Sequence, residues 1–297
     1  MAEEHKFLDS GVLNRLMHLT LMARSPMEGS VSGLHKSPHR GSSVEFAEYR
    51  NYVPGDDIRR LDWRVFARTD RFYLKEYEAE TNLRCYFVLD CSASMKFGNK
   101  LHYAKRLVAT MAYIAAHQGD AVGLICVAGK TFFEIPPRRN PAHLKLIYET
   151  MDKADARGQT DLAPALHDLA EKVRRRALVI VISDFFCDLG PLLNAFQHLR
   201  FQKHDMAVFQ LLDRAELDFQ FDRPVRFVDL ESSLSIVTEP STIRDEYLRQ
   251  FGLFMEALRD GCHEFGADYR RVVTDQNFER VLADFVVERA QLAASSP

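Results

Sequence analysis

The sequence has 297 residues, 46% of them hydrophobic, and its 39 Lys and Arg against 42 Asp and Glu give a formal charge of −3. A chain of this length buries roughly three quarters of its unfolded surface, so a sizeable core is possible. The hydrophobic content excludes disorder as the main state. The near-neutral balance argues against a protein that coats nucleic acid, and we expect no nucleic-acid partner.

The five cysteines contain no Cys-x-x-Cys pair, so neither a disulfide framework nor a structural zinc site is expected. The N-terminal residues lack the basic-then-apolar order of a signal peptide. No apolar run approaches the roughly 18 residues that a membrane span needs. We therefore expect a cytoplasmic protein without a membrane span.

Residues 1–80 are predicted to form a helix, a loop and a charged segment. Apolar residues at helical spacing predict an amphipathic helix over 7–23. Residues 25–43 are rich in Gly, Ser and His and show no periodicity, which is typical of a loop. Residues 44–80 are dense in charged and aromatic side chains, with a turn signal at Pro54-Gly55-Asp56.

Residues 81–240 are predicted to form the core, because short apolar runs alternate there with helical segments. The predicted strands cover 83–89, 121–128, 177–183 and 206–212, and 131–135 is expected to fold back as a hairpin. The predicted helices cover 100–117, 141–151 and 162–174. Strands that are apolar on both faces and alternate with helices favour a parallel sheet covered on both sides. The expected fold is α/β, with a doubly wound and mostly parallel sheet.

After residue 213 the pattern becomes irregular, with one strand predicted over 225–228. Two more helices are predicted near 242–259 and 277–290. We expect the segment 241–297 to be helical and to complete the core.

Three segments with oxygen-bearing side chains follow predicted strands or precede a predicted helix. They are residues 90–94, 158–161 and 183–184. Ligands of open α/β sheets collect at the carboxyl ends of the strands. Carboxylates and hydroxyls are hard ligands that suit Mg²⁺ or Mn²⁺ rather than zinc. The simpler alternative is that Ser and Asp in these positions only cap helices.

These residues carry a resemblance. Asp90-x-Ser92-x-Ser94, with Thr160 and Asp184, resembles the metal-ion-dependent adhesion site of von Willebrand factor A-type domains. An upstream segment resembles the signature of a bacterial family known as domain of unknown function fifty-eight. Its residues are Glu45, Phe46, Arg50, Tyr52, Pro54, Gly55, Asp56, Asp57, Arg59, Asp62, Trp63, Ala67 and Arg68. The resemblance spans about 24–289, most of the chain.

The resemblance implies roles for the metal set. Ser92 and Ser94 would bind Mg²⁺ or Mn²⁺ directly, and Thr160 would do so in at least one state. Asp90 and Asp184 would act mainly through water and hydrogen bonds, and an acidic residue of a protein ligand would complete the coordination. Gln159 departs from the family pattern, which usually has glycine there. Members are often encoded beside a MoxR-type AAA+ ATPase, which implies such a partner.

The charged signature segment has two interpretations. It could be a surface for binding a partner, or a network of salt bridges that holds the N-terminal segment on the core. The candidate partner-binding residues are Arg50, Asp56, Asp57, Arg59, Asp62 and Arg68.

The resulting hypothesis is a non-enzymatic, Mg²⁺-dependent interaction module that works with the ATPase as an adaptor or chaperone for client complexes. One alternative is a metal-dependent phosphoryl-transfer enzyme with Asp90 as nucleophile. In haloacid dehalogenase-type hydrolases a second carboxylate serves as acid and base, and Ser92 takes that position here. A second alternative is a metal-free structural scaffold.

Overall fold

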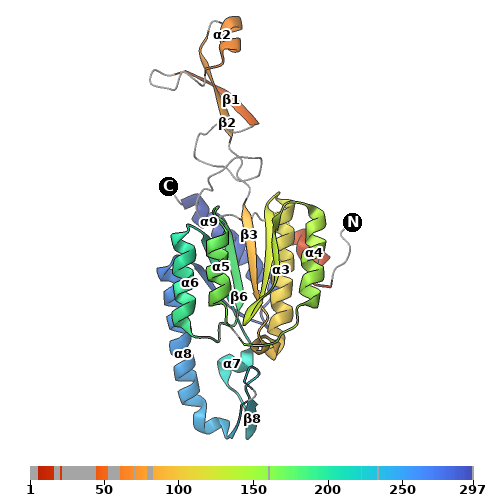
Figure 1. The fold of residues 1–297 in the computed structure, drawn as a ribbon, viewed down its shortest axis with the longest axis vertical. Coiled ribbons are helices and arrows are strands. Elements are labelled where there is room, and N and C mark those ends of the chain that lie inside the picture. The colour runs from red at the N-terminus through yellow and green to blue at the C-terminus, as the bar shows by residue number, and fades with distance from the viewer. Residues whose placement is uncertain are drawn as a thin grey trace. The chain divides into compact units, whose positions relative to one another are not determined.

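The computed structural model describes residues 6–16, 21, 45–52, 61–69, 71–78, 83–159, 161–221, 223–232 and 234–295 (Figure 1). Contacts divide the chain into two compact units, residues 25–83 on one side and residues 1–24 with 84–297 on the other. Unlike the expected division at residue 80, residues 1–24 belong to the larger unit, because helix α1 (Ser10–Leu16) packs against α3 (Lys100–His117) and α9 (Phe278–Ser295).

In its described residues, the smaller unit contains a two-stranded antiparallel sheet and a helix. Strand β1 (Glu45–Asn51) pairs with β2 (Tyr73–Glu78), and α2 (Trp63–Thr69) lies between them in the sequence. Asp62 caps α2, because its Oδ1 accepts hydrogen bonds from the backbone N–H groups of Arg64 at 2.9 Å and Val65 at 3.3 Å. A residue in this position satisfies donors that the first helical turn leaves unpaired.

The larger unit is built on a six-stranded sheet with the order β10-β7-β6-β3-β4-β5. All neighbouring strands are parallel except β4 and β5, which form the predicted antiparallel hairpin. The strands are β3 (Arg84–Asp90), β4 (Ala121–Ala128), β5 (Lys130–Arg138), β6 (Leu178–Ser183), β7 (Asp205–Leu212) and β10 (Asp268–Val273). The α/β class with a doubly wound, mostly parallel sheet is thus confirmed.

Helices complete this unit. The remaining ones are α4 (Pro141–Lys153), α5 (Ala163–Lys172), α6 (Leu189–Phe201), α7 (Arg214–Asp218), α8 (Pro240–Glu264) and the 3₁₀ helix η2 (Ala93–Asn99). A separate hairpin joins β8 (Val225–Val228) to β9 (Ser235–Thr238). The helix α6 and the strands β9 and β10 were not among the predicted elements. Among the described residues, none of the helices combines the length and the apolar character that crossing a membrane requires.

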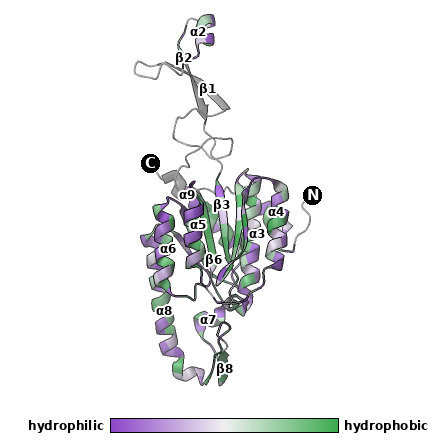
Figure 2. Ribbon diagram, viewed as in Figure 1, coloured by the Kyte–Doolittle hydropathy of each residue, from purple (hydrophilic) through white to green (hydrophobic). Residues whose placement is uncertain are grey.

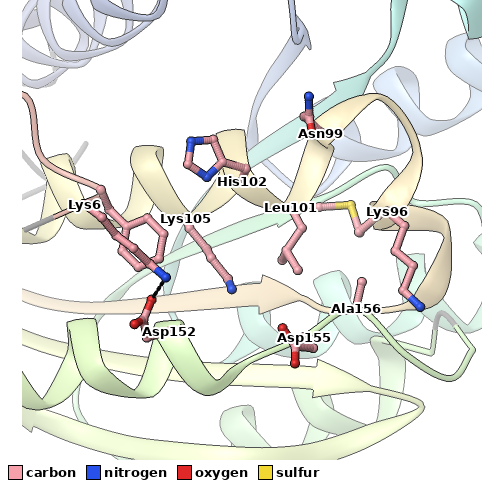
Figure 3. Close-up of a pocket in the computed structure, with 11 residues that line it drawn as sticks. Lys6, Lys96, Asn99, Leu101, His102, Lys105, Asp152, Asp155 and Ala156 are labelled. Atoms are coloured by element: carbon pink, nitrogen blue, oxygen red, sulfur yellow. Dashed lines mark ion pairs between the residues drawn. The ribbon is translucent and has the colours of Figure 1, made fainter.

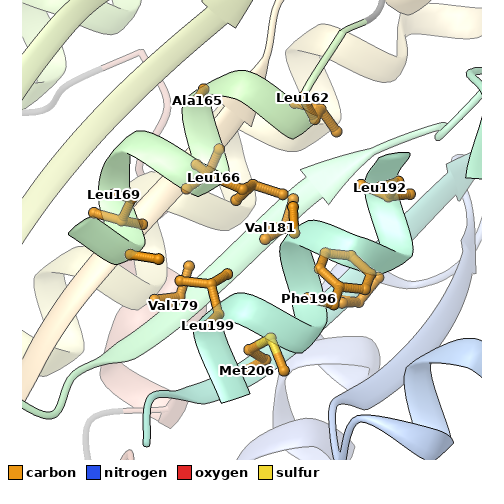
Figure 4. Close-up of a cluster of buried hydrophobic side chains, with 14 of the residues drawn as sticks. Leu162, Ala165, Leu166, Leu169, Val179, Val181, Leu192, Phe196, Leu199 and Met206 are labelled. Atoms are coloured by element: carbon orange, nitrogen blue, oxygen red, sulfur yellow. The ribbon is translucent and has the colours of Figure 1, made fainter. Parts of the chain in front are cut away.

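Side chains from both faces of the sheet are buried. On one face, Val179 and Val181 of β6 pack against Leu166 of α5 and Phe196 of α6 (Figure 4). The alternate residues point to the opposite face, where Phe209 of β7 meets Phe285 of α9 with ring centroids 4.8 Å apart. Figure 2 shows the same arrangement, with hydrophobic colour along the central strands and a mixture of colours on the surrounding helices.

The sheet order places the chain reversal at β3. From β3 the chain moves outward through β4 and β5, and it then returns to pair β6 on the other side of β3. A crevice forms at such a point, outside the carboxyl ends of the strands. Because Leu89 is paired with Ile182, the residues that follow them, Asp90 and Ser183, end neighbouring strands.

Candidate metal-binding site

Asp90 lies at the end of β3 and is almost completely buried. Its Oδ1 accepts a hydrogen bond from the backbone N–H of Ser92 at 2.8 Å, and its Oδ2 accepts one from the Ser183 hydroxyl at 2.5 Å. The Ser183 hydroxyl oxygen in turn accepts from the N–H of Phe185 at 2.8 Å. Asp90 therefore joins the loops that follow β3 and β6.

The hydroxyls of Ser92 and Ser94 lie side by side, with 3.0 Å between their Oγ atoms. Ser92 occupies the N-cap position of η2 in an extended conformation, but its side chain makes no capping hydrogen bond. Adjacent ligands of an octahedral Mg²⁺ with bonds of about 2.1 Å lie about 3.0 Å apart. The spacing of the two hydroxyls fits a pair of neighbouring ligands of this ion.

The loop that leads to Thr160 is hydrogen-bonded to the serine loop. The N–H of Ala93 donates to the carbonyl of Gly158 at 3.0 Å, and the N–H of Arg157 donates to the carbonyl of Cys91 at 2.7 Å. Gly158 has a φ of +71°, a conformation that glycine adopts without strain. Thr160 itself lies outside the described residues.

Lys100 is a part of the site that the sequence analysis missed. Its fully buried ammonium lies 2.6 Å from Asp184 Oδ2 and 2.7 Å from Glu216 Oε1. The signal was present in the helical periodicity, because Lys100 shares the buried face of α3 with Ala104 and Leu107. Glu216 belongs to a capping box with Asp213 at the start of α7, which holds its carboxylate near the site.

Burial controls the electrostatics here. Burial, and after it the charge of Asp184, raise the pKa of Asp90, and hydrogen bonds from Ser183 and Ser92 lower it. The net result is a pKa of about 7. Burial also raises the pKa of Glu216, and Lys100 opposes this effect. Without a metal, Asp90 therefore binds its proton more tightly than an exposed carboxyl does.

The donor set fits a hard cation. Within the described parts of the chain no three His, Cys, Asp or Glu side chains gather in a way that could hold a metal, so a site made only of such ligands is not formed there. The oxygens that converge are the Ser92 and Ser94 hydroxyls and the Asp90 carboxylate. Asp184 is engaged by Lys100 through Oδ2 and accepts from the N–H of Phe186 at 3.3 Å through Oδ1, so direct coordination by Asp184 would require a rearrangement.

The family is shown by comparison with known sequences. The model of the family described as "Protein of unknown function DUF58" matches residues 48–252. The chain belongs to this family. It is 29% identical over 286 residues to "Uncharacterized protein Rv1480" of Mycobacterium tuberculosis H37Rv, covering 92% of this chain and 88% of the relative. YeaD of Bacillus subtilis 168 is 29% identical over 119 residues, which are 40% of this chain and 28% of YeaD.

The solved structures that match this DUF58 chain have lower sequence identity to it than the relatives above. BatB from Bacteroides thetaiotaomicron matches with a TM-score of 0.49 and 18% identity, covering 71% of this chain and 100% of that one. The SpRpn10 VWA domain matches with a TM-score of 0.39 and 11% identity, covering 73% and 100% of the two chains. These likenesses are distant, and the fold assignment rests on the strand order described above.

The DUF58 signature residues are only partly described. Arg50 lies on β1 opposite Leu74, whereas Asp56, Asp57 and Arg59 lie outside the described residues. Asp62 is buried and caps α2, and Arg68 is exposed on the last turn of that helix. The partner-binding role of these six residues stays a prediction.

A cavity of about 670 Å³ adjoins η2 (Figure 3). Lys6 forms an ion pair with Asp152 at its edge, and Lys105 extends toward the space beside Asp155. Lys105 is 7% exposed, and its Nζ lies 5.7 Å from the centroid of the Phe7 ring. Burial lowers the pKa of Lys105. This second buried lysine of α3 was also missed in the sequence.

Proposed function

We propose that this DUF58 protein is a non-enzymatic protein-interaction module whose binding depends on Mg²⁺ or Mn²⁺. The observation that carries the proposal is the 3.0 Å separation of the Ser92 and Ser94 hydroxyls beside the buried Asp90 carboxylate. When bound, the ion would supply an electrophilic position that accepts a carboxylate from a partner.

The chain's own residues would position this ion. Ser92 and Ser94 would bind it directly, and Thr160 would join them in one state. Asp90 orients the serine loop by accepting a hydrogen bond from the Ser92 N–H. Its carboxylate would act on the ion through a bound water molecule. Since the direct ligands would be neutral hydroxyls, the ion would retain most of its attraction for an acidic residue of the partner.

A phosphoryl-transfer enzyme is less well supported. A nucleophilic carboxylate must be ionised and within reach of its substrate. Both oxygens of Asp90 accept hydrogen bonds, and the side chain is only 1% exposed. Ser92 stands where a second carboxylate would be needed as general acid and base.

One observation favours a metal-free scaffold as the second candidate. The Lys100 ammonium already pairs with both Asp184 and Glu216, so part of their negative charge is compensated without an added cation. In that case Lys100 would act as a permanent internal cation, and partner binding would be indifferent to chelators.

The proposed partner is a MoxR-type AAA+ ATPase, with the DUF58 chain acting as its adaptor or chaperone partner in the assembly of client complexes. This part of the proposal rests on the family resemblance. The test is capture of a MoxR-type ATPase from the same genome by the purified full chain, in Mg²⁺ and in EDTA. We expect capture in Mg²⁺ only, and its loss in Ser92→Ala and Ser94→Ala.

The matched control is Ser10→Ala, because Ser10 is an exposed serine on α1. It should capture the ATPase as the wild type does. Equal capture in Mg²⁺ and EDTA by every variant would rule out the metal-dependent module and favour the scaffold. Calorimetric titration with Mg²⁺, with the ATPase present, then distinguishes a partner-completed site from no site.

A further inference from the structure

An aromatic groove of about 610 Å³ begins at Ser94 and extends to the β8–β9 hairpin. Phe97 and Phe186 line its near end, and Phe219, Phe227 and Tyr247 line its middle. Phe97 follows the serine loop, and Phe186 follows Asp184, so the groove and the candidate metal site share two loops. In Figure 1, α7 and β8 lie together below the sheet.

The floor of the groove is preorganised by ring stacking. Phe219 stacks on Tyr247 with centroids 4.3 Å apart and on Phe227 with centroids 5.3 Å apart. Tyr247 also stacks on Phe251, at 5.5 Å. Rings held by one another lose little freedom when a ligand arrives, which favours binding of an apolar side chain.

Exposed aliphatic residues continue this apolar surface along the hairpin. Val228 and Leu230 line the groove and are 50% and 45% exposed. On β9, Ile236 and Val237 are 64% and 74% exposed. Figure 2 colours β8 as hydrophobic. Isolated apolar residues are common on protein surfaces, but a group of this kind beside a polar site is typical of a surface that binds another protein.

The charges along the groove indicate how a partner segment that contains an acidic residue would be oriented in it. At the near end, the Lys100 ammonium is shared by Glu216 and Asp184 and offsets part of their charge, and the proposed metal ion would offset the rest. At the far end, Asp229 lies at the turn of the hairpin, and its carboxylate would repel one. Arg226, between these ends, is exposed and has no ion pair among the described residues. With the metal ion bound, an acidic residue of the partner therefore belongs at the Ser94 end of the groove.

We infer that the groove binds a partner segment in which a large apolar side chain stands next to the acidic residue that the metal site takes. The carboxylate would bind at Ser92 and Ser94, and the neighbouring Leu, Ile or Phe would lie on the Phe219–Tyr247 stack. The inference rests on the proposed function and adds the apolar determinant, which would restrict the partners to a subset of acidic segments.

The test uses a random peptide library displayed on phage and selected on the full chain in millimolar Mg²⁺. Enriched peptides should carry Asp or Glu with a large apolar residue close by in sequence. Synthetic copies are then titrated by fluorescence polarisation. Val228→Asp should weaken binding by about 10- to 100-fold, the value of one buried apolar side chain. Leu230→Asp is the second groove variant, and Ser92→Ala should abolish binding.

Leu146→Asp is the matched control, because Leu146 on α4 is 48% exposed and does not line the groove. It should bind as the wild type does. Because all three positions are exposed, we expect the Asp variants to remain folded, and thermal melting checks this. Binding that Ser92→Ala loses and both groove variants keep would overturn this inference and leave the proposed function standing.

Other outcomes also decide the matter. Enriched peptides that carry an acidic residue without an apolar neighbour would overturn the inference, as would a library that yields no binder. Binding that the groove variants lose but EDTA and Ser92→Ala leave intact would overturn both the coupling and the proposed function. A dimer that Val228→Asp dissociates in sedimentation would show that a second copy covers the groove, which also contradicts the inference.

Discussion

The ammonium of Lys100 lies 2.6 Å from Asp184 Oδ2, and both side chains are completely buried. A buried charge is costly unless it is paired, and here one lysine serves two carboxylates, because Glu216 lies 2.7 Å from the same nitrogen. The Lys100 Nζ also lies 4.9 Å from the centroid of the Phe186 ring, which adds a favourable cation–π contact. Lys100 thereby connects the first turn of α3 to the loop after β6, which contains Asp184, and to α7, which contains Glu216.

Replacing Lys100 should therefore destabilise the fold. Lys100→Met leaves Asp184 and Glu216 without their cation, and breaking a buried pair from one side costs about 3–5 kcal/mol. Urea denaturation followed by circular dichroism measures the free energy of unfolding. The control is Lys172→Met, whose pair with Glu134 is exposed and should contribute less than about 1 kcal/mol. Equal losses in the two variants would contradict the role given to Lys100.

Gly98 should resist substitution. It has a φ of +56°, and a Cβ there would clash with the side chain of Asp213, whose Oδ1 caps α7. Gly98→Ala combines left-handed strain with a disturbed cap, so we expect a loss of about 2–4 kcal/mol in the free energy of unfolding. Gly252→Ala is the control, because a Cβ there meets nothing within 4 Å. On helix α8 it should stabilise by up to about 1 kcal/mol. Thermal melts of both variants measure the difference.

Magnesium should stabilise the folded chain. A ligand present at a hundredfold its Kd adds about 2.7 kcal/mol to the free energy of unfolding. We expect the melting temperature to rise with Mg²⁺ in the wild type and to stay constant in Ser92→Ala. Calcium is the comparison ion, because its longer bonds fit the 3.0 Å hydroxyl spacing less well. A rise that Ser92→Ala retains would place the responsible ion elsewhere.

Much of the larger unit could be predicted because its periodicity is strong. The bounds of β4, α3 and β8 match the predicted 121–128, 100–117 and 225–228. The helix α6 was overlooked although Asp188 caps it and its apolar residues recur at helical spacing. Strand β10 carried no clear signal, because Arg270 and Arg271 interrupt it, and only its pairing with β7 makes it a strand.

In the candidate site, too, some residues could be predicted from the sequence and others could not. Asp90, Ser92 and Ser94 are close in sequence and follow an apolar strand, so the sequence was enough to name them as candidates, and their role in metal binding stays a prediction. Lys100 contacts Asp184, which is 84 positions further along the chain, and Glu216, which is 116 positions further. A local sequence pattern cannot predict contacts over such separations. What the sequence did offer was the place of Lys100 on the apolar face of α3, where an unpaired lysine would not be stable.

The wild type and Asp90→Asn should differ in their pH dependence when EDTA removes metal. The pKa of Asp90 is raised from 3.8 to about 7, so the folded state binds this proton more tightly than the unfolded state does. The stability that this proton contributes is fully present below about pH 4 and is lost as pH rises to about 7, by up to about 1.4 kcal/mol per pH unit. The amide of the Asp90→Asn variant is uncharged throughout, so the variant gains on the wild type across this window, and the difference is constant above it.

Urea denaturation at each pH from 4 to 8 measures this difference between Asp90→Asn and the wild type. Asp245→Asn, which changes an exposed residue of α8, is the control and should follow the wild type at every pH. A stability difference between Asp90→Asn and the wild type that does not change over this range would mean that Asp90 is ionised in the metal-free fold. In that case the hydrogen bonds from Ser183 and Ser92 would outweigh the cost of burying the charge.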